Sequence, residues 1–337
     1  MVLYFWSACF HRFISIPDQP GEVVHKQSKP NYRSEYALFT GKCDSATMKR
    51  RLKMFKKVLV LAVIATVFVY ANVAKAQFVT EGLVSYWNFE SMTNGTVADA
   101  LGKNDGTIVG DAKTATGKVG NAVEFDGDGD YVDCGNNESL NFDSFDPFTI
   151  CAWIKGNEGR LEVVEPWQLW GQAIAGKIDA NWHGYLLTVT GVGHPDEPYT
   201  LNGVLSHELG GIDINSSTPD NSMEIVTDWT YVCMSYEGTS DVAGIHLSIN
   251  GEDQPVSSQR DNLTKTMANA APFTIGTIVN AGDGSWPVYF DGFIDEVAVY
   301  NRGLDEDEVS QNYDAGGVAV EPTSKLALTW GEIKASK

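Results

Sequence analysis

Short runs of β-branched and aromatic residues alternate with glycine-containing turn signals through most of this chain. The runs lie at Leu83–Phe89, Thr107–Val109, Ala122–Phe125, Phe148–Ile154, Tyr185–Val189, Trp229–Tyr236, Gly244–Ile249, Phe273–Ile278 and Phe293–Tyr300. The turn signals are Asn94-Gly95, Asn104-Asp105-Gly106, Asp126-Gly127, Asn202-Gly203, Asn250-Gly251 and Asp291-Gly292. Many short strands at regular spacing with glycine-rich turns are typical of an all-β sandwich or barrel. Since no linker interrupts the runs, we expect one all-β domain.

Two features of these runs sharpen the expectation. Ile245–Ile249 alternates apolar and polar residues with period two and then meets Asn250-Gly251, which predicts a hairpin. Aromatic and branched residues within strands are usually core residues rather than ligand platforms. We expect four of them to pack the core: Trp87, Phe125, Trp153 and Val299.

One segment near the end of the chain has a helical pattern. Asp305 is placed to cap the first turn, and Glu308, three residues later, completes a capping box. Acidic residues there also suit the positive end of the helix dipole. Gly316-Gly317 would end the helix, and the apolar residues expected to dock it on the sandwich are Leu304, Val309 and Tyr313. This acidic run is better explained as a helix start than as a metal site.

The N-terminal part of the chain resembles an export signal. Residues 48–57 are strongly basic, the fourteen residues Val58–Ala71 carry no charge, and Ala74-Lys75-Ala76 follows. A basic segment, an apolar segment of about 7–15 residues and a small-x-small site define a secretory signal peptide. We therefore expect a signal peptide over residues 48–76, cleavage after Ala76 and secretion or cell-surface display. The alternative is a retained anchor, although a membrane-spanning helix needs about 20 apolar residues.

Residues 1–47 show no periodicity, and so long a prefix is unusual before a signal peptide. Met48 or Met54 would make a normal start, so we interpret residues 1–47 as upstream sequence read in from a wrong start codon. The alternative is a genuine cytoplasmic extension. At the other end, residues 317–337 are expected to be a C-terminal tail.

Charge is distributed very unevenly along the chain. The whole chain has a formal net charge of −20. Residues 1–76 contain 12 Lys and Arg against 4 Asp and Glu, whereas residues 77–337 contain 12 against 40, which gives +8 and −28. A surface this acidic repels phosphate backbones and anionic lipid. We therefore expect neither a nucleic-acid partner nor a membrane partner after signal cleavage.

Several segments together resemble the LamG-like jelly-roll family of the concanavalin A-like lectin/glucanase superfamily. They are residues 82–90, 97–99, 105–109, 117–132, 148–154, 228–232, 247–252 and 290–302, followed by the capped helix. Each is weak alone, but their order and spacing are specific and cover about residues 82–316. The resemblance implies an antiparallel two-sheet jelly-roll sandwich with one short C-terminal helix, which we assign to residues 77–316.

The cysteines also resemble those of the pentraxin branch of this superfamily. Phe148-Thr-Ile-Cys151 and Val232-Cys233-Met-Ser-Tyr236 match two strands that a disulfide joins there. The resemblance implies a disulfide between Cys151 and Cys233, with Cys134 as the lone thiol of the secreted part. The alternative is three buried free thiols.

Calcium is the cofactor that the acidic residues suggest. Asp126-Gly-Asp128-Gly-Asp130 places three carboxylates within five residues, and hard oxygen ligands on a tight loop suit Ca²⁺. In related sandwiches a calcium ion ties an early loop to an Asp on the last strands, which implies Asp295 together with Asp126 or Asp128. The alternative is a solvated acidic turn, with Asp295 hydrogen-bonded to backbone. A second, pentraxin-like calcium site would use Asp179 and Asn181, but the later loop at residues 280–284 is poor in acids.

Loop tryptophans are the candidate carbohydrate contacts. Trp167, Trp170, Trp182 and Trp286 lie beside Pro, Gly or Asp residues. Exposed aromatic rings stack on pyranose faces, and the nearby Gln168, Asp179 and Asn181 could take hydroxyl groups. The alternative is that each tryptophan covers an edge of the sandwich.

Catalysis is not favoured by the sequence. Glucanases of this superfamily carry Glu-x-Asp-x-Glu on one strand, so that the acid and the nucleophile share a face, and no such strand is present. No Gly-x-Ser-x-Gly or His-Glu-x-x-His motif is present either. We expect a non-catalytic module that binds an extracellular glycan or glycoprotein. The alternatives are a protein-binding adhesion module and, less favoured, a glycoside hydrolase.

Overall fold

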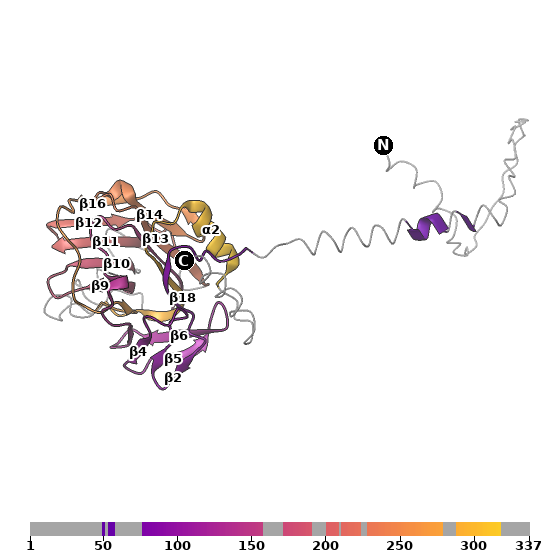
Figure 1. Ribbon diagram of the computed structural model, residues 1–337, viewed down its shortest axis with the longest axis horizontal. Coiled ribbons are helices and arrows are strands. Elements are labelled where there is room, and N and C mark those ends of the chain that lie inside the picture. Colours follow the sequence, from indigo (N-terminus) through magenta and orange to yellow (C-terminus); the bar gives the residue numbers. More distant parts are fainter. Residues whose placement is uncertain are drawn as a thin grey trace, which may run out of the picture. The chain divides into compact units, whose positions relative to one another are not determined.

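The computed structural model describes residues 49–50, 53–57, 76–157, 171–190, 200–208, 210–223, 228–278 and 288–317 (Figure 1). The chain divides into two compact units, Met1–Asn72 and Val73–Lys337. In the first unit the described residues are helical. No helix among the described residues is both long and apolar enough to cross a membrane. The second unit carries the strands.

Two antiparallel sheets build this second unit, as expected from the sequence. Sheet A runs in the order β15 (Glu252–Asp253), β14 (Ile245–Ile249), β13 (Thr230–Tyr236), β8 (Phe148–Gly156), β18 (Asp291–Tyr300), β6 (Asn121–Asp126) and β5 (Lys113–Thr116), with β1 (Leu83–Trp87) also paired to β18. Sheet B runs in the order β16 (Ser257–Asp261), β12 (Ile212–Ser217), β11 (Leu201–Glu208), β10 (Gly184–Val189), β9 (Gln172–Ile178), β17 (Thr274–Ile275), β7 (Tyr131–Asp133), β4 (Gly106–Val109), β3 (Thr96–Val97) and β2 (Met92–Thr93). Two 3₁₀ turns, Glu138–Leu140 and Val242–Gly244, and the helix α2 (Glu306–Ala315) complete the described elements. Figure 1 shows β9 to β12 and β16 at one side of the domain and α2 at the other.

The main core lies between the two sheets. Trp87, Phe125 and Val299 are fully buried in it, as the sequence predicted. The Trp87 ring stacks on that of Phe273 with centroids 5.5 Å apart, and its Nε1 donates to the carbonyl oxygen of Asn104 at 2.8 Å. The large indole is therefore buried with its polar atom satisfied, as a buried tryptophan requires.

A second apolar layer covers the outer face of sheet A. Residues of β8, β13 and β18 alternate between this layer and the main core, so sheet A is buried on both faces. Trp153 belongs to the second layer and not to the main core. Leu304, Val309 and Tyr313 pack α2 onto it, as predicted.

Helix α2 is fixed by its ends as well as by packing. The Asp305 side chain accepts from the N–H of Glu308, the Glu308 side chain accepts from the N–H of Asp305, and Gly316 ends the helix at a φ of 72°. Both predicted caps are confirmed. In addition, Glu308 forms an ion pair with Arg302, with Nη1 and Oε2 2.6 Å apart.

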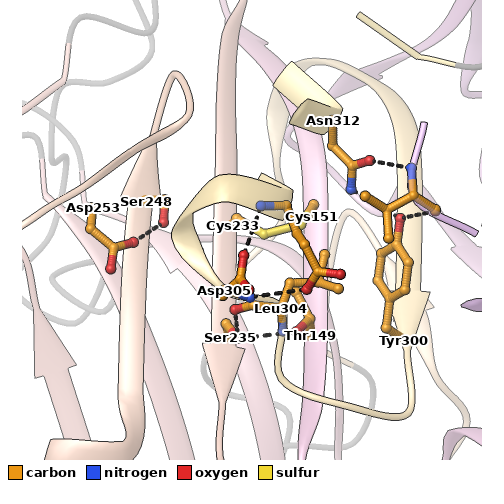
Figure 2. The surroundings of a disulfide bond; sticks show 12 residues. Thr149, Cys151, Cys233, Ser235, Ser248, Asp253, Tyr300, Leu304, Asp305 and Asn312 are labelled. Atoms are coloured by element: carbon orange, nitrogen blue, oxygen red, sulfur yellow. Dashed lines mark hydrogen bonds between the residues drawn. A yellow bond between two sulfur atoms is a disulfide. The ribbon is translucent and has the colours of Figure 1, made fainter. Parts of the chain in front are cut away.

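Figure 2 shows the contacts beneath this helix. Leu304 donates its N–H to Thr149 Oγ1 at 2.9 Å, and Ser235 Oγ donates to the Leu304 carbonyl at 2.8 Å. Asn312 accepts from the N–H of Val79 at 2.8 Å, and the Tyr300 hydroxyl donates to the Val79 carbonyl at 2.9 Å. The helix thereby joins strands β8, β13 and β18 to the N-terminal segment of the domain.

The predicted disulfide between Cys151 and Cys233 is present (Figure 2). The two cysteines are directly opposite each other on β8 and β13 and lie in the layer under α2. Cys134 is a buried free thiol, and burial raises its pKa well above the ordinary value.

Two of the predicted turns are wrong, whereas the hairpin at Asn250-Gly251 is confirmed by the pairing of β14 with β15. Asn202-Gly203 lies inside β11, where a Cβ on Gly203 would sit 2.7 Å from Met234 Sδ. Asp291-Gly292 opens β18, where a Cβ on Gly292 would sit 2.3 Å from the carbonyl oxygen of Lys155. At both positions glycine permits a close approach within the sandwich rather than a reversal of the chain.

Lys177 on β9 is fully buried, although lysine is rarely found there. Its ammonium donates to Asn136 Oδ1 at 2.7 Å and to the carbonyl oxygen of Ala271, which tie two loops to the strand. Burial lowers the pKa of Lys177 to about 8, although the negative charge of Asp179 opposes this shift.

The disulfide is expected to contribute strongly to stability, because it closes a separation of 82 residues. The variant Cys151→Ala/Cys233→Ala should lose about 4–5 kcal/mol of unfolding free energy by the chain-entropy estimate. Urea unfolding followed by tryptophan fluorescence measures this loss. The matched control, Cys134→Ala, removes a buried sulfur without a crosslink and should cost no more than about 1–2 kcal/mol. Equal losses in the two variants would contradict the expectation.

Lys177 should make stability depend on pH in the alkaline range. Between about pH 8 and pH 10 the unfolded chain keeps the lysine proton that the folded chain gives up, so the free energy of unfolding should rise with pH. Lys177→Met should flatten this rise in urea titrations at pH 7, 8, 9 and 10. Lys113→Met, on the exposed strand β5, should keep it. An unchanged slope in Lys177→Met would show that another group causes the dependence.

Candidate functional site

Three carboxylates converge where β6 ends and β7 is about to begin. Ligand oxygens of Asp111, Asp126 and Asp130 all lie within 4.8 Å of one another. Gly127 and Gly129 adopt φ values of 76° and 85°, which turn the chain tightly between two of these acids. Asp111 comes from the turn between β4 and β5. This cluster offers the hard oxygen ligands that suit a cation such as Ca²⁺.

Asp130 is the buried member of the cluster, with 2% of its surface exposed. Its Oδ1 accepts from the N–H of Asp111 at 2.7 Å. Burial raises the pKa of Asp130, and the charges of Asp126 and Asp111 raise it further, although backbone N–H groups oppose the shift. A bound cation would offset this mutual repulsion.

The other two predicted metal ligands lie outside this cluster. Asp128 is exposed, and its N–H donates to Asp126 Oδ1 at 2.9 Å. Asp295 is fully buried at a bulge of β18, where the strand changes partner from β6 to β1. The structure therefore brings Asp126 together with Asp111 and Asp130, and an ion shared with Asp295 stays a prediction.

The Asp295 carboxylate is surrounded by backbone donors. Oδ2 accepts from the N–H of Val119 at 3.1 Å, and Oδ1 accepts from the N–H of Glu296 at 2.8 Å. This is the hydrogen-bonded arrangement that the sequence left open as an alternative. Burial raises the pKa of Asp295 to about 7, and the nearby charge of Glu90 adds to this, while the N–H donors act against it.

The turn after β9 holds three further predicted residues. Asp179 Oδ1 accepts from the N–H groups of Asn181 at 2.8 Å and His183 at 3.0 Å, so this carboxylate already organises its own turn. Asn181 is exposed. Trp182 packs against a third apolar cluster, on the outer face of sheet B, and so covers the sheet there. Several predicted residues lie outside the described part of the chain: Trp167, Gln168, Trp170, Trp286 and the loop at residues 280–284.

A pocket of about 370 Å³ opens beside the outer layer of sheet A. Its lining comes from five separate places in the chain: Lys118; Ser222 and Met223; Asp228, Trp229 and Thr230; Ile249 and Asn250; and Tyr313. Neither Trp229 nor Tyr313 was among the predicted contacts. The sequence signals that could have found this pocket are the Asn250-Gly251 turn and the tryptophan at the start of β13.

The aromatic wall of this pocket is held rigidly. The Tyr313 ring stacks on Trp153 with centroids 5.5 Å apart and planes 29° from parallel. Lys118 Nζ lies 3.9 Å from the centroid of Trp153, within cation–π range. Trp229 lies 6.3 Å from Phe293 between ring centroids. Because Trp153 is buried on β8, the ring of Tyr313 rests on the sheet, whereas Lys118 is exposed and comes from the turn between β5 and β6.

The polar wall is set by the hairpin turn. Asn250 and Gly251 adopt φ values of 53° and 82°, as a type I′ turn requires, and Asn250 Oδ1 accepts from the N–H of Tyr231 at 3.0 Å. A Cβ on Gly251 would lie 3.0 Å from Cβ of Tyr313, so only glycine lets the turn approach the helix this closely. Asp228, which is exposed, adds a carboxylate to the lining. Partly exposed rings beside an amide and a carboxylate form a site that can hold a small polar ligand with an apolar face.

Comparison with solved structures gives matches of low sequence identity, each with a TM-score below 0.5. The binding domain of Paraclostridial Mosquitocidal Protein 1 is 17% identical with a TM-score of 0.48; the match covers 69% of this chain and 52% of that one, about half its length. Domain 4 of AbnA, an extracellular GH43 arabinanase from Geobacillus stearothermophilus solved with arabinotriose, is 19% identical with a TM-score of 0.47, over 68% and 98% of the two chains. A Trypanosoma rangeli sialidase in complex with 2,3-difluorosialic acid is 16% identical with a TM-score of 0.49. That match covers 71% of this chain and 34% of the sialidase chain.

The sequence itself was compared with curated proteins and with family models. No curated protein matches. The family model described as the concanavalin A-like lectin/glucanases superfamily matches residues 126–310, which is more than half of the 337 residues. This interval runs from the end of β6 into α2 and contains most strands of both sheets. The match confirms the resemblance deduced from the sequence segments, and the chain belongs to the concanavalin A-like lectin/glucanases superfamily.

Proposed function

We propose that residues 77–316 form a secreted, non-catalytic module that binds extracellular carbohydrate, and that the pocket beside Trp229 and Tyr313 is its binding surface. The observation that carries this proposal is the combination of two partly exposed aromatic residues with Asn250 and Asp228 around one pocket. A pyranose ring has an apolar face and a rim of hydroxyl groups. Its apolar face can therefore stack on the aromatic rings of the pocket, and its hydroxyl groups can form hydrogen bonds with the amide and the carboxylate.

The rigidity of the pocket supports binding. Tyr313 is held by its stack on Trp153, and the hairpin turn at Asn250 is held by its bond to the N–H of Tyr231. A wall that is already ordered costs little conformational entropy when a ligand binds, so a weak stacking surface can still give measurable affinity. Lys118 and Asp228, which are both exposed, add charges of opposite sign to the lining, where they can contact the polar groups of a ligand.

The described residues that line the pocket do not supply the layout that hydrolysis of glycosides needs. Hydrolysis takes two carboxyl groups about 5–10 Å apart, one on each side of the scissile bond. Among the described residues that line the pocket, Asp228 is the one carboxylate. This favours binding over catalysis at this place.

Secretion fits the same proposal. The basic and apolar leader over residues 48–76, with its small-x-small site at Ala74-Lys75-Ala76, is the pattern of a cleaved signal peptide. The disulfide between Cys151 and Cys233 is of the kind that persists in oxidising compartments. In this proposal the functioning protein begins at Gln77 and residues 317–337 form a tail.

Calcium is a second part of the proposal. The cluster of Asp111, Asp126 and Asp130 would hold the ion and so fix the turn between β6 and β7 to the turn between β4 and β5. The support is the convergence of their ligand oxygens within 4.8 Å and the burial of Asp130. Binding to the folded state alone would raise stability by mass action.

Carbohydrate binding is tested on a glycan array and then by calorimetry with the best glycan. Trp229→Ala and Tyr313→Ala should each weaken binding about five- to twelvefold, because each removes a stacking face worth about 1–1.5 kcal/mol. Phe145→Ala is the matched control, since Phe145 is the most exposed large apolar side chain described, at 75%, and does not line the pocket. Trp182→Ala tests the other predicted surface.

The outcomes separate the hypotheses. Loss in Trp182→Ala with retention in Trp229→Ala would move the carbohydrate site to the turn after β9. An array with no bound glycan would contradict the proposal and favour the protein-binding alternative, which a pull-down from secreted and surface proteins then examines. Release of shorter products from a bound glycan would overturn the non-catalytic assignment.

Calcium binding is tested by thermal unfolding in the presence of about 1 mM CaCl₂ and, separately, of about 1 mM EDTA. This calcium concentration is about the dissociation constant of the weakest extracellular calcium sites. Calcium should raise the Tm of the native chain, and Asp126→Asn and Asp130→Asn should abolish this rise. Asp128→Asn is the matched control, because Asp128 lies in the same turn but outside the cluster, and should keep it. A rise lost in Asp295→Asn but kept in Asp126→Asn would place the ion at Asp295 instead.

A further inference from the structure

The chain contains Asn-Gly at Asn94-Gly95, Asn202-Gly203 and Asn250-Gly251. An asparagine followed by glycine is chemically reactive, because glycine has no Cβ to hinder an approach of its own nitrogen to the preceding side chain. In the sequence the three pairs are equivalent. The structure places them in three different surroundings, and these surroundings decide which pair can react.

The reaction needs no other reagent than water. The glycine nitrogen forms a bond to Cγ of the asparagine, the side-chain nitrogen leaves as ammonia together with the proton of the glycine N–H, and a cyclic succinimide remains. Water then opens the ring at one of its two carbonyl groups, which gives either aspartate or isoaspartate. The first step requires a side chain that can turn toward the next residue and a backbone that can follow it.

Asn94-Gly95 meets both requirements. The pair forms the two-residue turn between β2 and β3, where Thr93 pairs with Thr96. Both residues of the turn are exposed, a Cβ on Gly95 would meet nothing within 4 Å, and the Asn94 side chain makes no hydrogen bond with another described residue. The strands β2 and β3 have two residues each, and β2 is the edge of sheet B. So short an edge hairpin opens locally at little cost.

Asn250-Gly251 is also a turn, but it is held on both sides. Asn250 Oδ1 accepts from the N–H of Tyr231 at 3.0 Å, which fixes the amide that the reaction would have to turn. Gly251 is buried against α2, and a Cβ on it would lie 3.2 Å from Cα of Ser310. The glycine nitrogen can therefore reach the side chain only if the turn first separates from the helix.

Asn202-Gly203 lies within a strand. Asn202 is 4% exposed and pairs with Thr188 of β10 on one side and with Ser217 of β12 on the other. Its Oδ1 accepts from Thr200 Oγ1 at 3.2 Å. Because neighbouring strands fix this backbone on both sides, a reaction here would require the sheet to open.

We propose that Asn94 is a site of spontaneous modification, which converts through a succinimide to aspartate and isoaspartate while Asn202 and Asn250 persist. Either product adds a negative charge to the turn between β2 and β3. Isoaspartate also lengthens the backbone of a two-residue turn whose geometry is closely defined, so it should weaken the pairing of β2 with β3. Asn250, which lines the pocket, is unchanged. The inference does not depend on carbohydrate binding or on secretion.

The test is incubation of the folded full chain in mildly alkaline buffer, followed by peptide mapping with tandem mass spectrometry. Conversion at Asn94 should be at least about tenfold faster than at Asn202 or Asn250, because the other two pairs react only after local opening. A methyltransferase specific for isoaspartate should label the peptide that contains residue 94. Asn94→Gly is the control variant, because Gly-Gly also suits this type of turn, and it should accumulate neither product there.

The unfolded chain shows whether the fold causes this selectivity. With the disulfide reduced and the chain unfolded in guanidinium chloride, the three pairs should convert at similar rates. An unfolded chain that still strongly favours Asn94 would overturn the proposal, because the selectivity would then come from the sequence. Conversion in the folded chain that is as fast at Asn250 or Asn202 as at Asn94, or that is absent at Asn94, would overturn it as well.

Discussion

The pairing of β18 with β8 is the constraint on which the rest of this domain depends. Both strands are buried on both faces, with one set of side chains in the core between the sheets and the alternate set in the layer under α2. On its other side β18 pairs first with β6 and then with β1, and the bulge at Asp295 marks the change of partner. Through these contacts one strand places the N-terminal segment, the turn of Val119 and the helix. The aromatic wall of the pocket follows, because Trp153 lies on β8 and Tyr313 lies on the helix above it.

Features with a local physical cause were predictable from the sequence. The cap at Asp305 and the hairpin turn at Asn250-Gly251 each rest on bonds within a few residues, and both were predicted correctly. The disulfide came from the resemblance to a family and not from spacing. The turn predicted at Asn202-Gly203 was wrong. The same dipeptide that forms a hairpin turn also fits within a strand, where the glycine lies against Met234 and Leu247. Only the packing of the opposite sheet distinguishes the two cases.

The candidate sites were less predictable, because long-range register creates them. The turn of Asp126 and Asp130 was visible, but Asp111 joins them only because the strands place the turn after β4 beside the turn after β6. The pocket draws on positions as far apart as Lys118 and Tyr313, and no spacing in the sequence relates them. The tryptophan that was predicted and is described, Trp182, lies against an apolar cluster on its sheet.

Several of the acidic residues that make the chain so negatively charged have structural roles, which their contacts show. Asp99 is buried, and its two oxygens accept four N–H groups, those of Tyr86, Leu101, Lys103 and Asn104. Asp213 is buried against Arg260, and Asp305 caps the helix. These carboxylates maintain loops and helix ends, so the excess of negative charge is in part a structural requirement.

The stack of Tyr313 on Trp153 determines how far an excised fragment of this domain must extend at its C-terminal end. The family match spans residues 126–310, which would look like natural limits for an excised fragment. A fragment with those limits would lack β1, Asp111 and the last turn of α2 together with Tyr313. It would keep most of both sheets yet lose two strand partners of β18, namely β1 and nearly all of β6, together with one member of the carboxylate cluster and one wall of the pocket. The smallest piece that preserves both sites therefore extends from the segment of Val79 through the glycine that ends the helix.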